Sequence, residues 1–378
     1  MTGIRGRLLA LAATLAVTLC GCAGLSAGPA VPVGNDWTTP PPMIDGTPVS
    51  EVAAPSARLT ADLGIQVYWN TADATRARQQ DEGTQIFNYV VGLGANSVGI
   101  DFPFFTDGEY PTRVYGVPGS TPSPAIIAML VANGRAHGLR VLVRPLLDDG
   151  NIMAVNGDWR GSIRPRSVSS WFRSYLGFLT PYLRAAQAGG ATAFGIDTEL
   201  DSLAGQAGDW ARVRSAAATL FTGQLVSAVN YGLWQQDKPG EPVPDAALDA
   251  YPPLGAASGA TVPTLTAAWV SWLRRHRPAQ ALEKTVLQEV GISAVAGAYA
   301  APAITAPDGT PLDVTVQRDW FAAACAAAKT TRLAGLYFFD VNSSDNPLDP
   351  VAAARYAPGS FIDRGDDVIK ACFGSGWS

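Results

Sequence analysis

The chain has 378 residues, of which 47% are hydrophobic and 16% are charged, enough for one large domain or two ordinary domains with a substantial core. Its formal net charge is -5 at pH 7, and it contains no long basic run. This charge argues against a protein that binds nucleic acid by neutralising phosphates. We therefore expect no nucleic-acid partner.

The first residues of the chain indicate an export signal. Two arginines precede the apolar run from Leu8 to Leu19, which is too short to span a membrane comfortably. The run ends in Leu19-Cys20-Gly21-Cys22, which resembles the lipobox of bacterial lipoproteins. This resemblance implies that residues 1–22 are a signal peptide and lipobox, that Cys22 is lipidated, and that the protein is anchored to the outer face of the cell membrane. The alternative is an ordinary secretory signal and a secreted protein.

The next segment, residues 23–58, is rich in Pro, Gly, Ser and Ala, a composition typical of a flexible or semi-extended tether. Residues 59–378 then form the predicted folded domain. Because export exposes Cys325 and Cys372 to oxidising conditions, they form either a disulfide or two buried thiols. The cysteines and the two histidines, His137 and His276, show no metal-ligand spacing, so we expect no metal and no cofactor.

Short apolar runs alternate with longer helical patterns through the predicted domain. The runs predict strands at 63–68, 97–102, 140–146, 193–200, 225–231, 248–251, 285–292 and 333–341, and the helical patterns lie at about 74–92, 122–137, 167–188, 208–222, 264–277, 316–330 and 363–373. Eight apolar strands separated mostly by helices indicate an α/β fold, a single-domain (β/α)8 TIM barrel. The alternative, an open doubly wound sheet, usually carries a Gly-rich phosphate fingerprint after a strand, and none is present.

Polar and aromatic residues lie where the predicted strands end. In a (β/α)8 barrel, the active site forms at the carboxyl ends of the strands. Carboxylates and amides there can bind sugar hydroxyls, and flat rings can pack on sugar C–H faces. The candidates for substrate binding or support are Trp69, Asp101, Arg144, Asn230, Tyr251, Phe338 and Asp340.

The glutamates narrow the prediction further. The chain has only seven, at positions 51, 82, 109, 199, 241, 283 and 289, and only Glu199 and Glu289 lie inside predicted strands. Burying a carboxylate is costly unless it is paired, hydrogen-bonded or functional. Glu199 and Glu289 fall on the fourth and seventh strands, from which their side chains can converge across the barrel mouth. Two such carboxyl groups are what glycoside hydrolysis requires. The alternative is a pair of structural ion pairs in the barrel mouth.

At these positions the chain resembles clan A glycoside hydrolases, which are retaining enzymes on a (β/α)8 barrel. Within the clan it most resembles family 113, whose characterised activity is endo-β-1,4-mannanase. The resemblance rests on 64-GIQVYW-69, 198-TEL-200, 251-YPPL-254, 289-EVG-291 and 335-GLYF-338. It implies that Glu199 is the acid/base and Glu289 the nucleophile. It also implies that Tyr251 hydrogen-bonds the nucleophile and that Arg144 lies beneath it.

Two positions depart from the usual clan pattern. Thr198 precedes the acid/base where many members have Asn, and Phe338-Phe339 stand where many have Trp. The resemblance to clan A implies a retaining β-glycosidase that acts on an extracellular or cell-envelope polysaccharide, and the resemblance to family 113 implies a mannanase-like one. We expect a monomer. The alternative function is a carbohydrate-binding lipoprotein that keeps the barrel and hydrolyses little.

Overall fold

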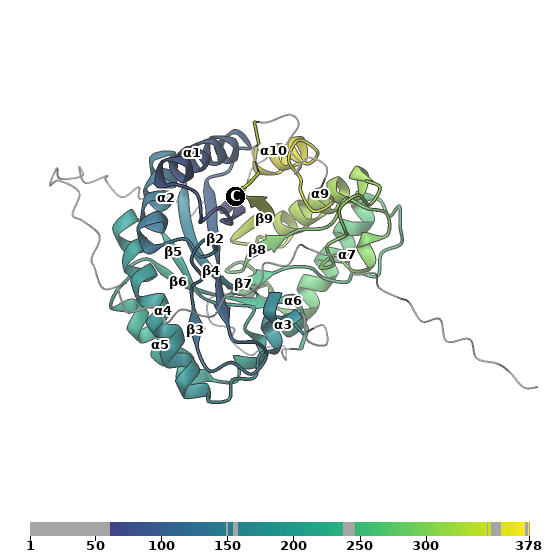
Figure 1. The fold of residues 1–378 in the computed structure, drawn as a ribbon. Helices are drawn as coiled ribbons and strands as arrows, with labels where there is room; N and C mark the ends of the chain where they lie inside the picture. Colours follow the sequence, from purple (N-terminus) through teal and green to yellow (C-terminus); the bar gives the residue numbers. More distant parts are fainter. Residues whose placement is uncertain are drawn as a thin grey trace, which may run out of the picture. The chain divides into compact units, whose positions relative to one another are not determined.

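The computed structural model describes residues 61–148, 150–153, 158–236, 246–345, 347–348, 357–374 and 377 (Figure 1). All of them belong to the second of two compact units, which spans residues 53–378. The predicted signal peptide, the lipidation site Cys22 and the tether at 23–58 lie outside the described residues. Within the described part of the chain, no helix combines the length and the apolar character needed to cross a membrane.

A closed parallel barrel forms the centre of the described domain, as the sequence predicts. Each barrel strand pairs with its neighbours in parallel, and β1 pairs with both β2 and β9, which closes the sheet. The described barrel strands are β1 (Asp62–Tyr68), β2 (Ser97–Thr106), β4 (Arg140–Leu147), β5 (Ala193–Thr198), β6 (Gln224–Asn230), β7 (Ala246–Asp249), β8 (Val286–Val290) and β9 (Gly335–Asn342). The (β/α)8 prediction is therefore confirmed.

Helices surround the barrel, with α1, α2, α4 and α5 on one side and α7, α9 and α10 on the other (Figure 1). The longer described helices are α1 (Arg76–Gly92), α2 (Pro124–Ala136), α4 (Val168–Gly189), α5 (Ala207–Ala218), α7 (Val262–His276), α9 (Val314–Thr330) and α10 (Asp366–Gly374). The shorter ones are α3 (Gly150–Met153), α6 (Tyr231–Gln236) and α8 (Ala279–Leu282), with 3-10 turns η2 (Arg160–Ser162), η3 (Asp201–Leu203) and η4 (Ala298–Ala300). The sequence patterns place the seven long helices to within a few residues.

Two details of the strands differ from the prediction. The strand carrying Glu199 ends at Thr198, because Glu199 itself adopts a left-handed backbone conformation with φ of 54°. A short strand, β3 (Val114–Tyr115), is not predicted. It pairs antiparallel with Phe105 and Thr106 at the end of β2.

Glycines make room for large polar side chains inside the barrel. A Cβ atom on Gly99 of β2 would lie 1.5 Å from the Gln66 Oε1 atom, and one on Gly195 of β5 would lie 2.8 Å from the Arg144 Cγ atom. Gln66 crosses the interior and donates to the Gln288 carbonyl at 2.7 Å. The absence of side chains at these glycines lets Arg144 and Gln66 fill the space below the barrel mouth.

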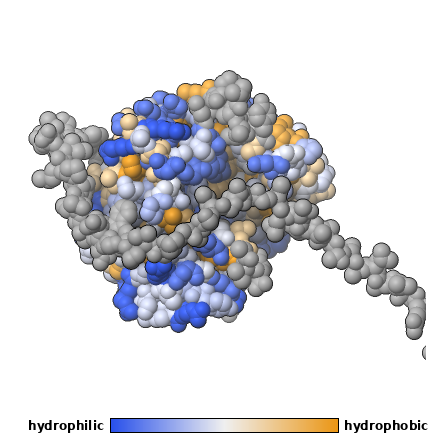
Figure 2. All heavy atoms as spheres, in the orientation of Figure 1, coloured by the Kyte–Doolittle hydropathy of each residue, from blue (hydrophilic) through white to orange (hydrophobic). Residues whose placement is uncertain are grey.

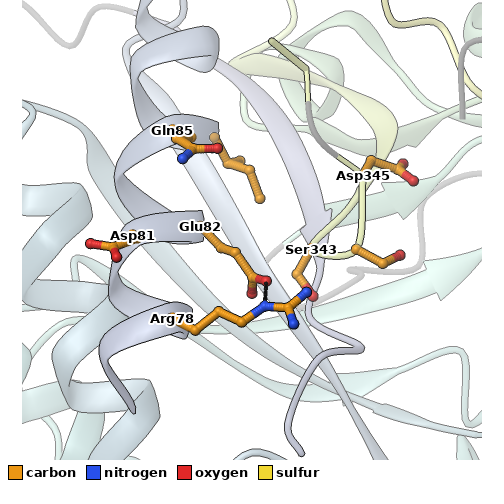
Figure 3. Close-up of a pocket in the computed structure, with 8 residues that line it drawn as sticks. Arg78, Asp81, Glu82, Gln85, Ser343 and Asp345 are labelled. Carbon is orange, nitrogen blue, oxygen red and sulfur yellow. Dashed lines mark hydrogen bonds and ion pairs between the residues drawn. The ribbon is translucent and has the colours of Figure 1, made fainter. Parts of the chain in front are cut away.

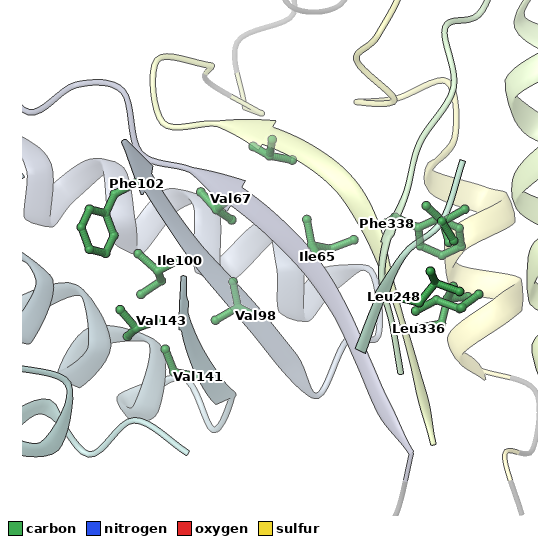
Figure 4. Close-up of a cluster of buried hydrophobic side chains, with 14 of the residues drawn as sticks. Ile65, Val67, Val98, Ile100, Phe102, Val141, Val143, Leu248, Leu336 and Phe338 are labelled. Atoms are coloured by element: carbon green, nitrogen blue, oxygen red, sulfur yellow. The ribbon is translucent and has the colours of Figure 1, made fainter. Parts of the chain in front are cut away.

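The hydrophobic core lies between the strands and the helices. Ile65, Val98, Ile100, Val143 and Leu336 are fully buried on the strands (Figure 4). Burying an aliphatic side chain of this size contributes about 1.5–3 kcal/mol each. This packing makes the barrel a rigid support for the side chains at its mouth.

A disulfide joins two helices of the outer layer. Cys325 on α9 and Cys372 on α10 are bonded, with their Cα atoms 5.9 Å apart. The sequence left open a disulfide or two buried thiols, and the structure contains the disulfide. It connects the last helix of the described chain to the helix that precedes β9.

On the face drawn in Figure 2, hydrophilic residues cover much of the described surface, and hydrophobic ones appear in scattered patches. Three of the exposed large hydrophobic residues, Ile304, Leu312 and Val314, belong to the long segment around the start of α9.

Candidate active site

Glu289 lies within β8 and accepts hydrogen bonds on both carboxylate oxygens. The Arg144 Nη2 atom, from β4, donates to its Oε1 atom, and the Tyr251 hydroxyl donates to its Oε2 atom at 2.7 Å. Only 4% of Glu289 is exposed. Because a guanidinium and a hydroxyl both donate here, Glu289 acts as an acceptor through both oxygens, the role suited to an ionised carboxylate.

Arg144 is fully buried and contacts three carboxylates. Besides Glu289, its Nε atom lies 3.2 Å from the Asp101 Oδ1 atom and its Nη1 atom 3.1 Å from the Asp249 Oδ1 atom. Asp249 is also the register partner of Glu289 across β7 and β8. The planar guanidinium therefore ties β2, β4, β7 and β8 together directly beneath the barrel mouth.

Burial is the largest influence on the pKa values of Asp101 and Asp249. It raises the pKa of Asp101 to about 7, although the Arg144 charge acts in the opposite direction. Burial also raises the pKa of Asp249 well above its usual range, against the same opposing charge. The cluster therefore has more acids than its single guanidinium can balance, so part of its negative charge is removed by protonation near neutral pH.

Glu199 follows β5 and faces the same space. Its backbone amide donates to the Ala228 carbonyl of β6 at 3.0 Å. Its Oε1 atom accepts a hydrogen bond of 2.6 Å from the Asn230 Nδ2 atom, and its Oε2 atom lies 3.2 Å from the Arg160 Nη1 atom. Glu199 is one of three described non-glycine residues with positive φ. Such a conformation costs on the order of 1–3 kcal/mol and is frequent at functional positions.

The environment of Glu199 favours its protonated form. Burial raises the pKa of Glu199 to about 7, and the negative charge of Glu289 raises it as well, whereas Arg160 and Asn230 act to lower it. Two carboxyl groups thus share one site, but one is surrounded by donors and the other holds a proton near neutral pH. This asymmetry suits two carboxylates with different roles.

Two tyrosines lie beside the carboxyl groups. The rings of Tyr231 and Tyr251 meet edge to face, with centroids 6.4 Å apart. Burial and the charge of Glu289 raise the pKa of Tyr251 well above its usual range, so its hydroxyl stays protonated and remains a donor. Burial and the charge of Glu199 raise the pKa of Tyr231. Both tyrosines therefore face the two carboxylates as neutral hydroxyls.

Asp340 lies at the end of β9, with its side chain partly accessible. Its Oδ2 atom accepts a hydrogen bond of 3.4 Å from the Asn342 side chain. Burial, together with the charges of Asp345 and Glu289, raises the pKa of Asp340 to about 8. Asp340 therefore belongs to the carboxylate cluster at the mouth, where the sequence places it.

Two of the residues predicted to bind or support the substrate, Trp69 and Phe338, lie in the hydrophobic core instead. Trp69 is fully buried, and its indole N–H donates to the Gln79 side chain of α1 at 3.0 Å. Phe338 is also fully buried, between Phe321 of α9 and Phe373 of α10. Phe338 lies on the helix-facing side of β9, because side chains alternate between the two faces of a strand, and Trp69 follows β1 and contacts α1. The next residue, Phe339, is the partly accessible one of the pair.

Asn230, predicted to bind or support the substrate, contacts Glu199. Its amide donates to Glu199, and its Oδ1 atom accepts a hydrogen bond of 2.7 Å from the Gly232 amide. Both the nitrogen and the oxygen of the side-chain amide therefore make hydrogen bonds. Its position suits the support of Glu199 and also the capping of the turn after β6.

The sequence patterns did not single out Arg160, which contacts Glu199 from η2. Its turn is set locally: the Ser162 hydroxyl donates to the Trp159 carbonyl at 2.7 Å, and the Trp159 amide donates to the same hydroxyl at 3.1 Å. The Trp159 ring packs over Gly161. The only sequence signal for this turn is the Trp-Arg-Gly-Ser run in the loop after the third barrel strand.

A separate polar pocket of about 260 Å³ lies between α1 and the segment that follows β9 (Figure 3). Arg78 and Glu82 form an ion pair of 2.8 Å in it, and Asp345 lies on the opposite wall. Neither Glu199 nor Glu289 is among the residues that line it. In the described residues, no group of three or more His, Cys, Asp or Glu side chains is arranged to hold a metal ion.

Several solved structures of glycoside hydrolases have a similar fold. A GH113 β-1,4-mannanase complex is 15% identical, with a TM-score of 0.67 over 84% of this chain and 100% of that chain. The GH113 β-mannanase AaManA from Alicyclobacillus acidocaldarius, in complex with ManMIm, is 19% identical, with a TM-score of 0.62 over 84% of this chain and 98% of that chain. GH5_18 from Streptomyces cattleya, in complex with GlcNAc, is 14% identical, with a TM-score of 0.54 over 84% and 82%.

Comparison with curated protein sequences gives no match. The family model of Glycoside Hydrolase Family 113 matches residues 68–354, which is most of the chain and includes every strand end that carries the site. The predicted resemblance is thereby confirmed at the level of the family. The chain belongs to Glycoside Hydrolase Family 113 and is a glycoside hydrolase.

Proposed function

We propose that this glycoside hydrolase is a retaining β-glycosidase in which Glu289 is the nucleophile and Glu199 is the acid/base. The observation that carries the proposal is the difference between the two carboxyl groups. Arg144 and Tyr251 donate to both oxygens of Glu289, whereas the pKa of Glu199 is raised to about 7. One group is thus suited to attack and the other to donate a proton.

The reaction takes two steps. In the first, a Glu289 oxygen forms a bond to the anomeric carbon while the glycosidic C–O bond breaks, and Glu199 gives its proton to the leaving oxygen. In the second, Glu199 removes a proton from water, whose oxygen attacks the anomeric carbon and releases Glu289. The sugar leaves with the configuration it had at the start.

The substrate that we propose is a β-1,4-mannan-type polysaccharide outside the cell. The family match and the β-mannanases of similar fold support this class of glycan. The N-terminal sequence supports export, with a lipid anchor at Cys22 and the tether at 23–58 placing the barrel near the membrane surface. Phe339 and Asp340, rather than Phe338, are the residues of β9 that we assign to the sugar next to the nucleophile.

The experiment is a hydrolysis screen of the purified protein against β-mannan, β-glucan and aryl β-glycosides. Glu199→Gln and Glu289→Gln are assayed beside the wild type, with Glu283→Gln as the control, because Glu283 is 48% exposed in a surface ion pair. We expect Glu199→Gln to lower polysaccharide turnover by about 10²–10⁴-fold. It should lose less in the bond-breaking step with an aryl glycoside whose leaving group needs no proton. Glu289→Gln should lose turnover on every substrate.

NMR of the first-formed product tests retention, since a retaining enzyme releases the β-anomer from a β-glycoside. Wild-type turnover that neither substitution reduces would refute the assignment. A wild-type protein that binds mannan but hydrolyses no glycoside would instead favour the carbohydrate-binding lipoprotein.

A further inference from the structure

Tyr231 brings a hydroxyl to the barrel mouth that no neighbouring side chain uses. It is the first residue of α6, directly after β6, and it is partly exposed. Within the described part of the chain, its hydroxyl makes no hydrogen bond. The other donors around it are engaged, since the Tyr251 hydroxyl donates to Glu289 at 2.7 Å and the Asn230 amide donates to Glu199 at 2.6 Å. Tyr231 therefore offers a donor and an acceptor that these contacts leave unused.

Two neighbours place the Tyr231 ring beside the carboxyl groups. The preceding residue, Asn230, ends β6 and is held by its hydrogen bond to Glu199. On the other side, the Tyr231 ring meets the ring of Tyr251 edge to face, with centroids 6.4 Å apart, and Tyr251 is itself hydrogen-bonded to Glu289. Because a tyrosine side chain rotates about only two bonds, these contacts leave its hydroxyl little freedom.

The Tyr231 hydroxyl belongs to the Glu199 side of the mouth. Burial and then the charge of Glu199 raise the pKa of Tyr231, whereas Glu289 is the leading charge on Tyr251. In the proposed reaction, Glu199 protonates the leaving oxygen and Glu289 attacks the anomeric carbon from the other side of the scissile bond. The sugar that leaves must therefore lie against Glu199, next to Tyr231.

We propose that the Tyr231 hydroxyl binds a hydroxyl group of the sugar in the leaving-group position and so holds the glycosidic oxygen beside Glu199. This inference rests on the proposed roles of Glu199 and Glu289. Because the raised pKa keeps the phenol neutral, its oxygen can both donate to the sugar and accept from it. Tyr231 exchanges no proton in either step, since the proton still passes between Glu199 and the leaving oxygen.

Two substrates that differ in their leaving group test this contact. Tyr231→Phe removes the hydroxyl and keeps the ring that packs against Tyr251. Since one hydrogen bond between neutral groups is lost, we expect kcat/KM for β-1,4-mannohexaose to fall about 3- to 10-fold. Dinitrophenyl β-mannobioside has an aryl leaving group without sugar hydroxyls, so its kcat/KM should stay within about twofold of the wild-type value. We compare kcat/KM because it covers the reaction from free enzyme through the breaking of the glycosidic bond.

Tyr110→Phe is the matched control. Tyr110 is 46% exposed, and its ring lies 6.0 Å from the Arg166 guanidinium in a loop after β2. This substitution also removes one tyrosine hydroxyl, so kcat/KM should stay at the wild-type value with both substrates. Thermal unfolding of both variants checks that they are folded.

The difference between the two substrates decides the inference. Equal losses on both would overturn it, because the hydroxyl would then act on Glu199 or on the sugar that stays bound to Glu289. No loss on either substrate would also overturn it, because the hydroxyl would then contact no sugar.

The proposed function fails in a different way. A wild-type enzyme that hydrolyses no glycan would refute the proposed function and this inference with it, whereas an active wild type without a selective loss in Tyr231→Phe would overturn the inference alone. If the screen finds activity on another β-glycan, an oligosaccharide of that glycan and its dinitrophenyl glycoside replace the mannose compounds, and the same outcomes decide.

Discussion

Replacing Arg144 with methionine should destabilise the protein strongly. The guanidinium is fully buried and contacts Asp101, Asp249 and Glu289. Methionine fills much of the same volume but carries no charge, so three buried acids lose their common partner. Breaking a buried ion pair typically costs about 3–5 kcal/mol, because it leaves an uncompensated charge. That is a large part of the roughly 5–15 kcal/mol by which domains are stable.

Thermal unfolding measures this loss. At about 2–4 °C for each kcal/mol, we expect the Tm to fall on the order of 10 °C at pH 8. Arg212→Met is the control, because Arg212 is 71% exposed and its ion pair with Asp209 on the surface of α5 contributes at most about 1 kcal/mol. Since the acids become neutral when protonated, the deficit should shrink as the pH falls below the raised pKa of Asp101, about 7.

A compensated variant tests the cause of the loss. Adding Asp101→Asn and Asp249→Asn to Arg144→Met removes two of the unpaired charges and should recover part of the lost Tm. A Tm for Arg144→Met within about 2 °C of the Arg212→Met control would refute the reasoning. So would a triple variant no more stable than Arg144→Met alone.

Three further predictions concern Tyr251, the disulfide and Glu199. Tyr251→Phe removes the 2.7 Å hydrogen bond to Glu289 and should lower kcat/KM by about 10- to 150-fold with little change in Tm, whereas an unchanged kcat/KM would contradict its role. Replacing Cys325 and Cys372 together with serine should lower the free energy of unfolding by about 4 kcal/mol, because the disulfide closes a loop with a sequence separation of 47. The Tm of this variant should match that of the reduced wild type, and a Tm equal to that of the oxidised wild type would contradict the prediction. The wild-type kcat/KM should fall as the pH rises through about 7, because Glu199 must be protonated to act as the acid, and Glu199→Gln should lack this limb.

Much of the fold could be predicted because apolar runs and helical periodicity are local properties of the chain. The eight barrel strands and the seven long helices lie close to their predicted positions. The strand order follows from the fold class, since each strand of a (β/α)8 barrel pairs with its neighbours in sequence. A strand as short as β3, with two residues, is too short to show the alternation of apolar and polar residues by which strands are recognised.

The pair Glu199 and Glu289 was also predictable, for an energetic reason. A glutamate inside an apolar strand is costly unless something compensates it, so its presence there marks a site. Arg144 and Tyr251 were placed near Glu289 by family resemblance, and the structure brings both within hydrogen-bonding contact of it. Asp249 is the direct register partner of Glu289 on the neighbouring strand, but only the folded barrel makes this visible.

By itself, then, the sequence determined the barrel, its strand order and the placement of Glu199 and Glu289 near the ends of two barrel strands, because each depends on composition and spacing along the chain. Only the tertiary structure decided which side chains reach the barrel mouth. Trp69 and Phe338 prove to be core residues, because their side chains pack against helices α1, α9 and α10. Arg160 reaches Glu199 from a loop turn with no periodic pattern, and a contact between residues 39 positions apart depends on folding in three dimensions.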